Sequence, residues 1–160
     1  MRSRFRQEFV VTSPAVKLTV LHPAARIPSY AHHNDAGADL TSIEDVTLSP
    51  GERALVHTGI AIALPDNLVA LVHPRSGLAL KHGIGMVNAP GTIDAGYRGE
   101  IMVLLINHDR SDSVTLPAGT RIAQLVIQEV LQPTFTVVEE LPDSIRSTGG
   151  FGSTGTIHAG

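Results

Sequence analysis

Short apolar segments recur along the chain at intervals of about ten residues, and Gly or Pro separates most of them. Alternating apolar and polar positions predict half-buried strands at 16–20, 46–48 and 60–64. The runs 68–73 and 101–106 are apolar on both faces, which is typical of strands that are covered on both sides or lie in a subunit interface. Further strands are expected at 122–127 and 134–138.

Only one segment has a helical pattern, SGLALKHG at 76–83, and it spans barely two turns. The whole pattern predicts an all-β fold, a sandwich or jelly roll of short strands. The last fifteen residues hold five of the fifteen glycines, and such a segment cannot hold a fixed conformation alone. We expect an extension of unknown role at 1–14, a β domain at 15–140 and a mobile C-terminal arm at 141–160.

Length and composition narrow the fold and the classes of function. A chain of 160 residues is the size of one domain with one core. Aromatic residues make up only 4% and Trp is absent, so Val, Leu, Ile and Ala must fill that core, which favours strands. The net charge is −3 and most basic residues are scattered, so no nucleic-acid partner is expected.

Several kinds of chemistry are excluded by what the sequence lacks. There is no Cys, which excludes disulfides, thiolate nucleophiles and Cys-ligated metal sites. No apolar run reaches the roughly 18 residues of a membrane helix, and no adequate hydrophobic region follows the basic N-terminus, so we expect a cytoplasmic protein without a membrane partner. There is no Walker loop and no GxGxxG after a strand. HHND at 32–35 offers a His–His pair without a third metal ligand at useful spacing, and no serine of a possible triad lies in a nucleophile elbow.

Four glycine-marked stretches at strand ends contain residues capable of chemistry: AGADL (36–40), HPRSGLA (73–79), GTIDAGYRGE (91–100) and RIAQLVI (121–127). Each has an ordinary explanation. Asp39 can be a turn residue, Arg75 a surface charge, Ser76 a helix N-cap and Gln124 an edge-facing polar group. Together with the glycine-rich tail, however, they suggest a site for a phosphorylated aromatic ligand, with the tail as its lid.

Five stretches, in this order, resemble the five motifs of the homotrimeric dUTP pyrophosphatases (dUTPases): AGADL, PRSGLA, VNAPGTIDAGYRGEI, RIAQLVI and RSTGGFGSTG. The likeness runs from about residue 15 to residue 155, and its third motif is highly specific. It implies a jelly-roll homotrimer whose active sites lie between subunits, each closed by the arm of another chain. It also implies Mg²⁺-dependent hydrolysis of dUTP to dUMP and pyrophosphate, which limits uracil incorporation into DNA and supplies dUMP for thymidylate synthesis.

By this resemblance the third motif performs the reaction and reads the substrate. Asp94 resembles the carboxylate that holds and deprotonates a water for in-line attack on the α-phosphorus. Tyr97 resembles the residue whose ring packs against the deoxyribose and leaves no room for a 2′-hydroxyl. The main chain of the turn reads the uracil and excludes a 5-methyl group. The residues expected to bind base and sugar are Asn88, Thr92, Ile93, Asp94, Tyr97 and Met102.

Two other motifs resemble the parts of the family that hold the triphosphate. Arg75, Ser76 and Gly77 match the residues that grip the phosphates, with Gln124 beside them. Arginine presents a planar cationic fork to phosphate oxygens, and a serine hydroxyl can donate as the leaving group gains charge. Asp39 matches the residue that holds Mg²⁺ through water, which suits a metal that keeps most of its hydration shell.

The arm is expected to complete the site from another subunit. Arg146 would reach the γ-phosphate, Phe151 would stack over the uracil, and Gly152 with Ser153 would offer further hydrogen-bond donors. These roles come from the resemblance of the fifth stretch to the family's last motif.

Two other functions remain possible at this point. One is a dCTP deaminase-like enzyme, which resembles the same fold, although that group uses a glutamate near the base and lacks the GTIDAGYRGE turn. The other is a non-catalytic deoxynucleotide sensor. Retention of Asp94, Gln124 and the whole arm argues against a sensor, because a pure binder does not need a water-holding carboxylate.

Overall fold

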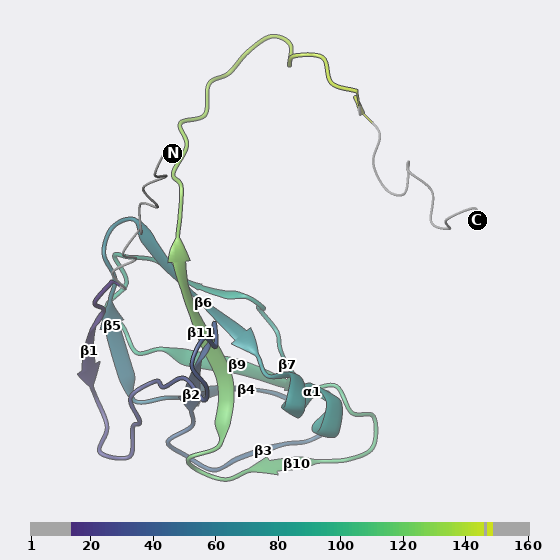
Figure 1. Ribbon diagram of the computed structural model, residues 1–160. Coiled ribbons are helices and arrows are strands. Elements are labelled where there is room, and N and C mark those ends of the chain that lie inside the picture. The colour runs from purple at the N-terminus through teal and green to yellow at the C-terminus, as the bar shows by residue number, and fades with distance from the viewer. Residues whose placement is uncertain (1–13, 146, 149–160) are drawn as a thin grey trace, which may run out of the picture.

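The strands predicted from the alternating pattern form antiparallel sheets. The computed structural model describes residues 14–145, 147 and 148 (Figure 1). Within them, one sheet has the order β2 (Ala38–Thr41), β11 (Arg121–Glu129), β6 (Leu68–Pro74) and β8 (Gly91–Ile93). A second has the order β4 (Arg53–His57), β9 (Met102–Asn107) and β7 (Ile84–Met86). Two-stranded pairs join β1 (Lys17–Val20) to β5 (Ile60–Ala63) and β3 (Val46–Leu48) to β10 (Val114–Leu116).

One aliphatic core joins these sheets. Its buried side chains come from both larger sheets and both two-stranded pairs, and include Leu40, Val72, Val56 and Leu105. Fully burying one such side chain contributes about 1.5–3 kcal/mol, so the core is the main source of stability in a chain without Trp. The expected all-β jelly roll is confirmed.

The strand β9 presents apolar side chains to both of its faces, as its sequence predicted. Val103 and Leu105 point into the core and are buried, whereas Leu104 and Ile106 lie on the other face and are only partly covered. On the neighbouring strand β4, Leu55 pairs with Leu104 and is exposed. In a single chain, the outer face of β4 and β9 is therefore apolar and partly exposed to solvent.

The short helix predicted at 76–83 is confirmed as α1 (Ser76–His82). It ends at Gly83, whose left-handed φ of 64° is a conformation that favours glycine, and the Gly83 N–H donates to the Ala79 carbonyl. Arg75 is the N-cap residue, at the junction of β6 and α1. This helix, the only one in the described residues, is too short to cross a membrane.

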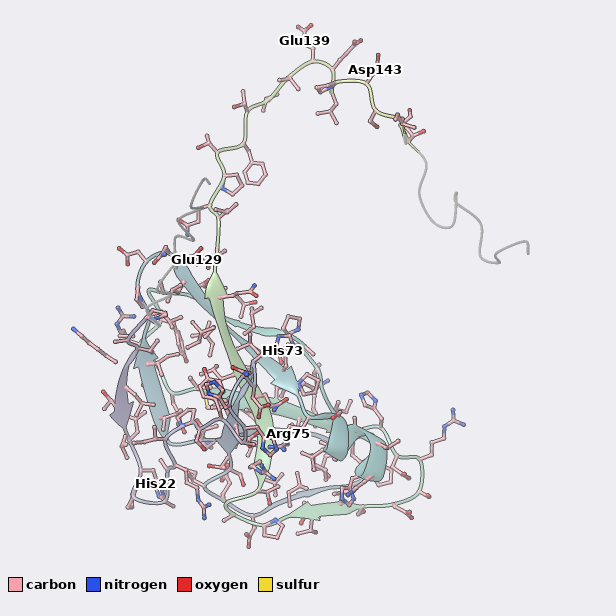
Figure 2. The ribbon with its side chains drawn as sticks, viewed as in Figure 1. His22, His73, Arg75, Glu129, Glu139 and Asp143 are labelled. Atoms are coloured by element: carbon pink, nitrogen blue, oxygen red, sulfur yellow. The ribbon has the colours of Figure 1, made fainter. Side chains whose placement is uncertain are left out.

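The strand predicted at 134–138 is wrong. Residues 131–145 form neither helix nor strand, and Phe135 and Val137 are 92% and 99% exposed. Figures 1 and 2 show this segment leaving the end of β11 and running away from the sheets, with Glu139 and Asp143 far from them. An alternating pattern gives a segment the period of a strand, but a strand also needs a hydrogen-bonding neighbour, and none of the described residues pairs with this segment.

The single core predicts a large contrast between two leucine substitutions. Leu105 is 1% exposed and Leu80, on α1, is 88% exposed. Leu105→Ala is expected to lower the free energy of unfolding by about 2–5 kcal/mol in urea denaturation, because it leaves a cavity. The matched variant Leu80→Ala should change it by no more than about 0.5 kcal/mol. Equal effects of the two substitutions would contradict this assignment of the core.

Candidate functional site

The turn that follows β8 presents a carboxylate to solvent. The strand pairs with β6, with Ile93 opposite Ala70, and ends directly before Asp94. The Tyr97 N–H donates to the Asp94 carbonyl at 3.0 Å, which closes a four-residue turn. The Asp94 side chain is exposed at the start of this turn. The carboxylate is therefore accessible to water and to a ligand lying over the turn.

A hollow of about 170 Å³ lies beside this turn. Its lining residues are Val72, Met86, Asn88, Gly91, Thr92, Ile93, Tyr97, Glu100, Ile101 and Met102. Five of the residues expected to bind base and sugar are thus brought together, since only Asp94 of that set is not among the lining residues. Aliphatic side chains combined with an amide, a phenol and main-chain groups suit a flat heterocycle attached to a sugar. We refer to this space as the hairpin hollow.

Tyr97 is held in place by the loop that follows it. Its hydroxyl donates to the Glu100 carbonyl at 3.0 Å. A Cβ atom on Gly99 would collide with the Tyr97 hydroxyl, so glycine at that position lets the ring lie across the main chain. Gly96 has open space around its Cα and no such requirement. The aromatic wall of the hairpin hollow therefore depends on residues 97–100 keeping their conformation.

Glu100 is a site residue that the sequence analysis did not single out. It lines the hairpin hollow, and its carboxylate accepts from the Gly59 N–H at 2.7 Å. Its other oxygen lies 2.9 Å from His57 Nδ1. Its place in the stretch GTIDAGYRGE is the sequence feature that could have identified it. The partners of its carboxylate, however, lie more than forty residues away in sequence.

A second group of predicted residues surrounds Asp39. This side chain is buried, with the residue only 8% exposed, and its two oxygens accept from Arg75 and Arg121. The Arg121 contact is 2.9 Å. Asp39 is therefore a buried ion-paired residue in β2 and Arg75 is its partner, so the turn and surface-charge explanations are wrong. Arg121, the first residue of RIAQLVI, is a second residue that the sequence analysis did not single out.

The pairing of β11 brings the other phosphate-motif residues toward Arg75. Gln124 lies opposite Asp39 of β2 and His73 of β6, so it sits in a central strand and the edge-position explanation is wrong. Ser76 is the first residue of α1, and no side chain caps the helix, so the N-cap explanation is wrong as well. Figure 2 shows Arg75 beside β11.

A basic hollow of about 280 Å³ lies at this end of the sheet. Its lining residues are Arg75, Gly77, Leu78, Lys81, His82, Thr120 and Arg121. Two guanidinium groups and an ammonium group make it suited to phosphate oxygens. Because Asp39 contacts both arginines, it fixes the two charged groups on which this suitability depends.

The two hollows share no lining residue. The carboxylate expected to activate water lies beside one, and the arginine expected to grip phosphates lies in the other. In the described part of one chain, these two residues therefore lie at separate hollows. The expected arm residues Arg146, Phe151, Gly152 and Ser153 lie outside the described residues.

The described residues contain no group of three metal-ligating side chains, and the HHND loop forms no such group. Asp39 could hold Mg²⁺ only through a metal-bound water. Each of its oxygens is already engaged by an arginine, which argues against direct coordination. A carboxylate oxygen has a further acceptor position, however, so both oxygens can still accept from a metal-bound water. The residues thus fit an outer-sphere metal.

Comparison with known proteins identifies the family of the chain. Residues 24–155 match the family model dUTPase. The chain is 61% identical over 145 residues to the deoxyuridine 5'-triphosphate nucleotidohydrolase of Thermobifida fusca, covering 91% of this chain and 81% of the relative. It is 60% identical over 134 residues to the protein of the same name from Bifidobacterium longum subsp. infantis, covering 84% of each.

Solved structures show the same likeness. The dUTPase of Staphylococcus bacteriophage 80alpha with dUPNHPP superposes with a TM-score of 0.84 at 32% identity, over 90% of this chain and 100% of that one. A variant dUTPase from phage phi11 of S. aureus, described with a structural Mg(II) ion, gives a TM-score of 0.75 at 28% identity, over 81% of this chain and 100% of that one.

The ion pairs of Asp39 predict a stability effect. Asp39→Asn keeps the side-chain shape but removes the charge that faces Arg75 and Arg121. It should lower the free energy of unfolding in urea by about 1–3 kcal/mol, because Arg75 is left partly buried without its carboxylate. The control Asp66→Asn, on the exposed turn before β6, should stay within about 0.5 kcal/mol of the parent protein. If both variants unfold alike, Asp39 does not anchor the basic hollow.

Proposed function

The chain belongs to the dUTPase family and is a dUTP nucleotidohydrolase, and on this premise we propose that Asp94 activates the water that attacks the α-phosphorus. The observation that supports this most directly is the hairpin hollow. It brings Asn88, Thr92, Ile93, Tyr97 and Met102 together directly beside the Asp94 turn. The products are dUMP and pyrophosphate, so the reaction limits uracil incorporation into DNA and supplies dUMP for thymidylate synthesis.

Uracil recognition follows from the position of β8. Among the described residues this strand is at the edge of its sheet, with β6 on one side only, so its other edge presents main-chain donors and acceptors to a ligand. A pyrimidine edge can pair with these groups much as another strand would, and the Asn88 amide adds a donor and an acceptor. Close pairing of this kind leaves little room for a 5-methyl group, which disfavours dTTP.

Sugar discrimination is assigned to Tyr97. Its ring lines the hairpin hollow and its hydroxyl is held at the Glu100 carbonyl. A ring fixed in this way packs against the face of a deoxyribose. A 2′-hydroxyl would collide with it, so UTP is rejected by exclusion.

The chemical step needs a base and a leaving group stabilised by charge. Asp94 accepts a proton from the attacking water as the water oxygen bonds to the α-phosphorus. The bond from that phosphorus to the bridging oxygen breaks, and pyrophosphate leaves with the electron pair. Arg75 and the Ser76 hydroxyl stabilise the charge on the departing phosphates, with Gly77 and Gln124 beside them.

Magnesium is assigned to the triphosphate end of the substrate. Asp39 would hold it through water, in keeping with its two occupied oxygens. When bound, the ion supplies positive charge that neutralises the phosphate oxygens. The structural Mg(II) ion described for the phage phi11 protein supports a metal in this family.

We assign the complete site to the interface of a homotrimer. Asp94 and Arg75 border separate hollows in one chain, so a second chain is needed to supply the missing half. The apolar outer face of β4 and β9 and the exposed side chains of 131–145 offer surfaces for such an assembly. The arm at 141–160 of another chain would close the site with Arg146, Phe151, Gly152 and Ser153.

We also propose that the protein is cytoplasmic, with which a chain without Cys is compatible. We propose neither a nucleic acid nor a membrane as its partner. The β domain is assigned to 15–140, and no role is assigned to 1–14.

Substrate selectivity provides the test of the reaction. The purified protein with Mg²⁺ is incubated separately with dUTP, dTTP, dCTP and UTP, and the products are separated by chromatography. We expect dUMP and pyrophosphate from dUTP and little turnover of the other three. The hairpin hollow excludes the 5-methyl group of dTTP and the 2′-hydroxyl of UTP, and cytosine reverses the donor and the acceptor that uracil presents at N3 and C4. Ammonia released from dCTP would instead indicate a deaminase, and binding of dUTP without turnover would indicate a sensor.

The role of Asp94 is tested by a substitution that keeps its shape. Asp94→Asn removes the proton acceptor and should lower kcat for dUTP by at least about 100-fold. Calorimetry should show dUTP binding within a few-fold of the parent protein, because the base and phosphate contacts remain. Asp66→Asn is the control for removal of an exposed carboxylate and should leave kcat unchanged. Near-normal kcat in Asp94→Asn would exclude the general-base role.

A further inference from the structure

Glu100 joins the wall of the hairpin hollow to a distant turn. Its carboxylate accepts from the Gly59 N–H at 2.7 Å, at the turn between β4 and β5, and faces His57 Nδ1 at 2.9 Å. Gly59 has a positive φ of 70°, and a Cβ there would collide with His22 and Ala25, so this turn has little freedom to move. Glu100 is therefore attached by its side chain to a rigid part of the β4–β5 connection.

The main chain of the same residue holds Tyr97. The Glu100 carbonyl accepts from the Tyr97 hydroxyl at 3.0 Å. The next residue, Ile101, donates its N–H to the Ile60 carbonyl at 2.8 Å and accepts from the Thr58 hydroxyl at 2.5 Å. One side chain and two adjacent peptide units thus fix the segment that orients the aromatic ring over the hollow.

We propose that Glu100 is a positioning residue for sugar discrimination, and that its pairing with His57 holds Tyr97 where it excludes a 2′-hydroxyl. This inference rests on the proposed function, because it assigns the source of the selectivity of the same site. Glu100 acts through Tyr97 and is not assigned any part in the chemical step.

The charges around His57 make the pairing of Glu100 with His57, and so the position of Tyr97, sensitive to pH. Two carboxylates face it, that of Glu100 and that of Glu44, which accepts from the His57 main-chain N–H at 3.0 Å. His22, beside Gly59, is the other titratable group at this turn. The hydrogen bond to Glu100 raises the pKa of His57 above its ordinary value of 6.5, burial opposes this, and the charges of Glu100 and Glu44 add to the rise.

Glu100 shifts in the complementary direction. Burial raises its pKa, but hydrogen bonds from His57 and from Gly59 more than offset this, and the net pKa lies below 4.5. A raised His57 pKa means that its contribution is complete below about pH 6.5 and is lost as the pH rises through the folded-state value. A lowered Glu100 pKa means that its contribution is complete above about pH 4.5 and is lost in stronger acid. The pair is therefore strongest between about pH 4.5 and 6.5.

The test is the selectivity ratio, kcat/KM for dUTP divided by kcat/KM for UTP, measured from pH 6 to pH 9. Ionisations that affect both substrates equally cancel in this ratio. Because the pair is partly exposed, we expect the ratio to fall by up to about fivefold as His57 loses its proton. Glu100→Gln should have, at every pH, the low selectivity ratio that the parent protein reaches when His57 is neutral. His57→Arg carries a permanent charge and should make the selectivity ratio independent of pH.

Glu44→Gln is the matched control. It makes the same chemical change beside the same histidine, but Glu44 does not contact Tyr97 or line the hollow. At pH 6 its ratio should equal that of the parent protein. The fall of the ratio should come at a lower pH than in the parent protein, because the charge of Glu44 no longer raises the pKa of His57. If Glu100→Gln lowers the melting temperature while its ratio also follows the parent protein, the role of Glu100 is structural only and the proposal is overturned. If Glu100→Gln does not fold, His57→Gln provides the same comparison.

A binding measurement separates this proposal from the proposed reaction. The ratio of Kd values for UMP and dUMP, measured by calorimetry, needs no turnover. A protein that does not hydrolyse dUTP, but whose Kd ratio falls in Glu100→Gln, would contradict the reaction and support the positioning role. An unchanged Kd ratio in Glu100→Gln would overturn the positioning role whatever the turnover.

Discussion

The position of β11 between β2 and β6 brings together the charged residues of the basic hollow. Its register places Gln124 opposite Asp39 on one side and opposite His73 on the other. Arg75 follows β6 directly, so it reaches the buried Asp39 carboxylate, and Arg121 approaches from β11 itself. A basic surface for phosphate is thereby built on rigid strands and stabilised by one buried acid.

The same sheet order places β8 at the outer edge, beyond β6. An edge strand has free main-chain groups, which is what recognition of a pyrimidine edge requires. The proposed base-recognition residues and the proposed phosphate-binding residues therefore border different hollows in one chain. The proposed sharing of the site between subunits would bring such hollows together, and it would give a function to the apolar surfaces that a single chain leaves open.

Much of the fold was predictable because strands that are buried on one face have alternating apolar residues, and strands that are buried on both faces have continuous apolar runs. Strands such as β5, β6 and β9 were recognised from their alternating or continuous apolar runs, and the motif stretches identified Asp94, Tyr97 and Arg75. The prediction failed at 134–138, where the pattern was present but no described strand pairs with the segment. An alternating apolar pattern does not show whether a neighbouring strand is present to form the hydrogen bonds of a sheet.

The pairings within the site were not predictable in the same way. Asp39 contacts two arginines that lie 36 and 82 positions away from it in sequence. Glu100 contacts His57 at a sequence separation of 43. Such contacts are set by strand register, which a single sequence does not state. Glu100 and Arg121 therefore went unassigned although both lie within recognised motifs.

Mixing two inactive variants shows whether Asp94 and Arg75 of different chains form one active site. Asp94→Asn and Arg75→Ala subunits are unfolded and refolded together so that mixed trimers form. If each site takes the two residues from different chains, roughly a quarter of the sites contain both intact, and dUTP turnover should recover to that fraction. No recovery from mixed trimers of confirmed composition would contradict the shared site.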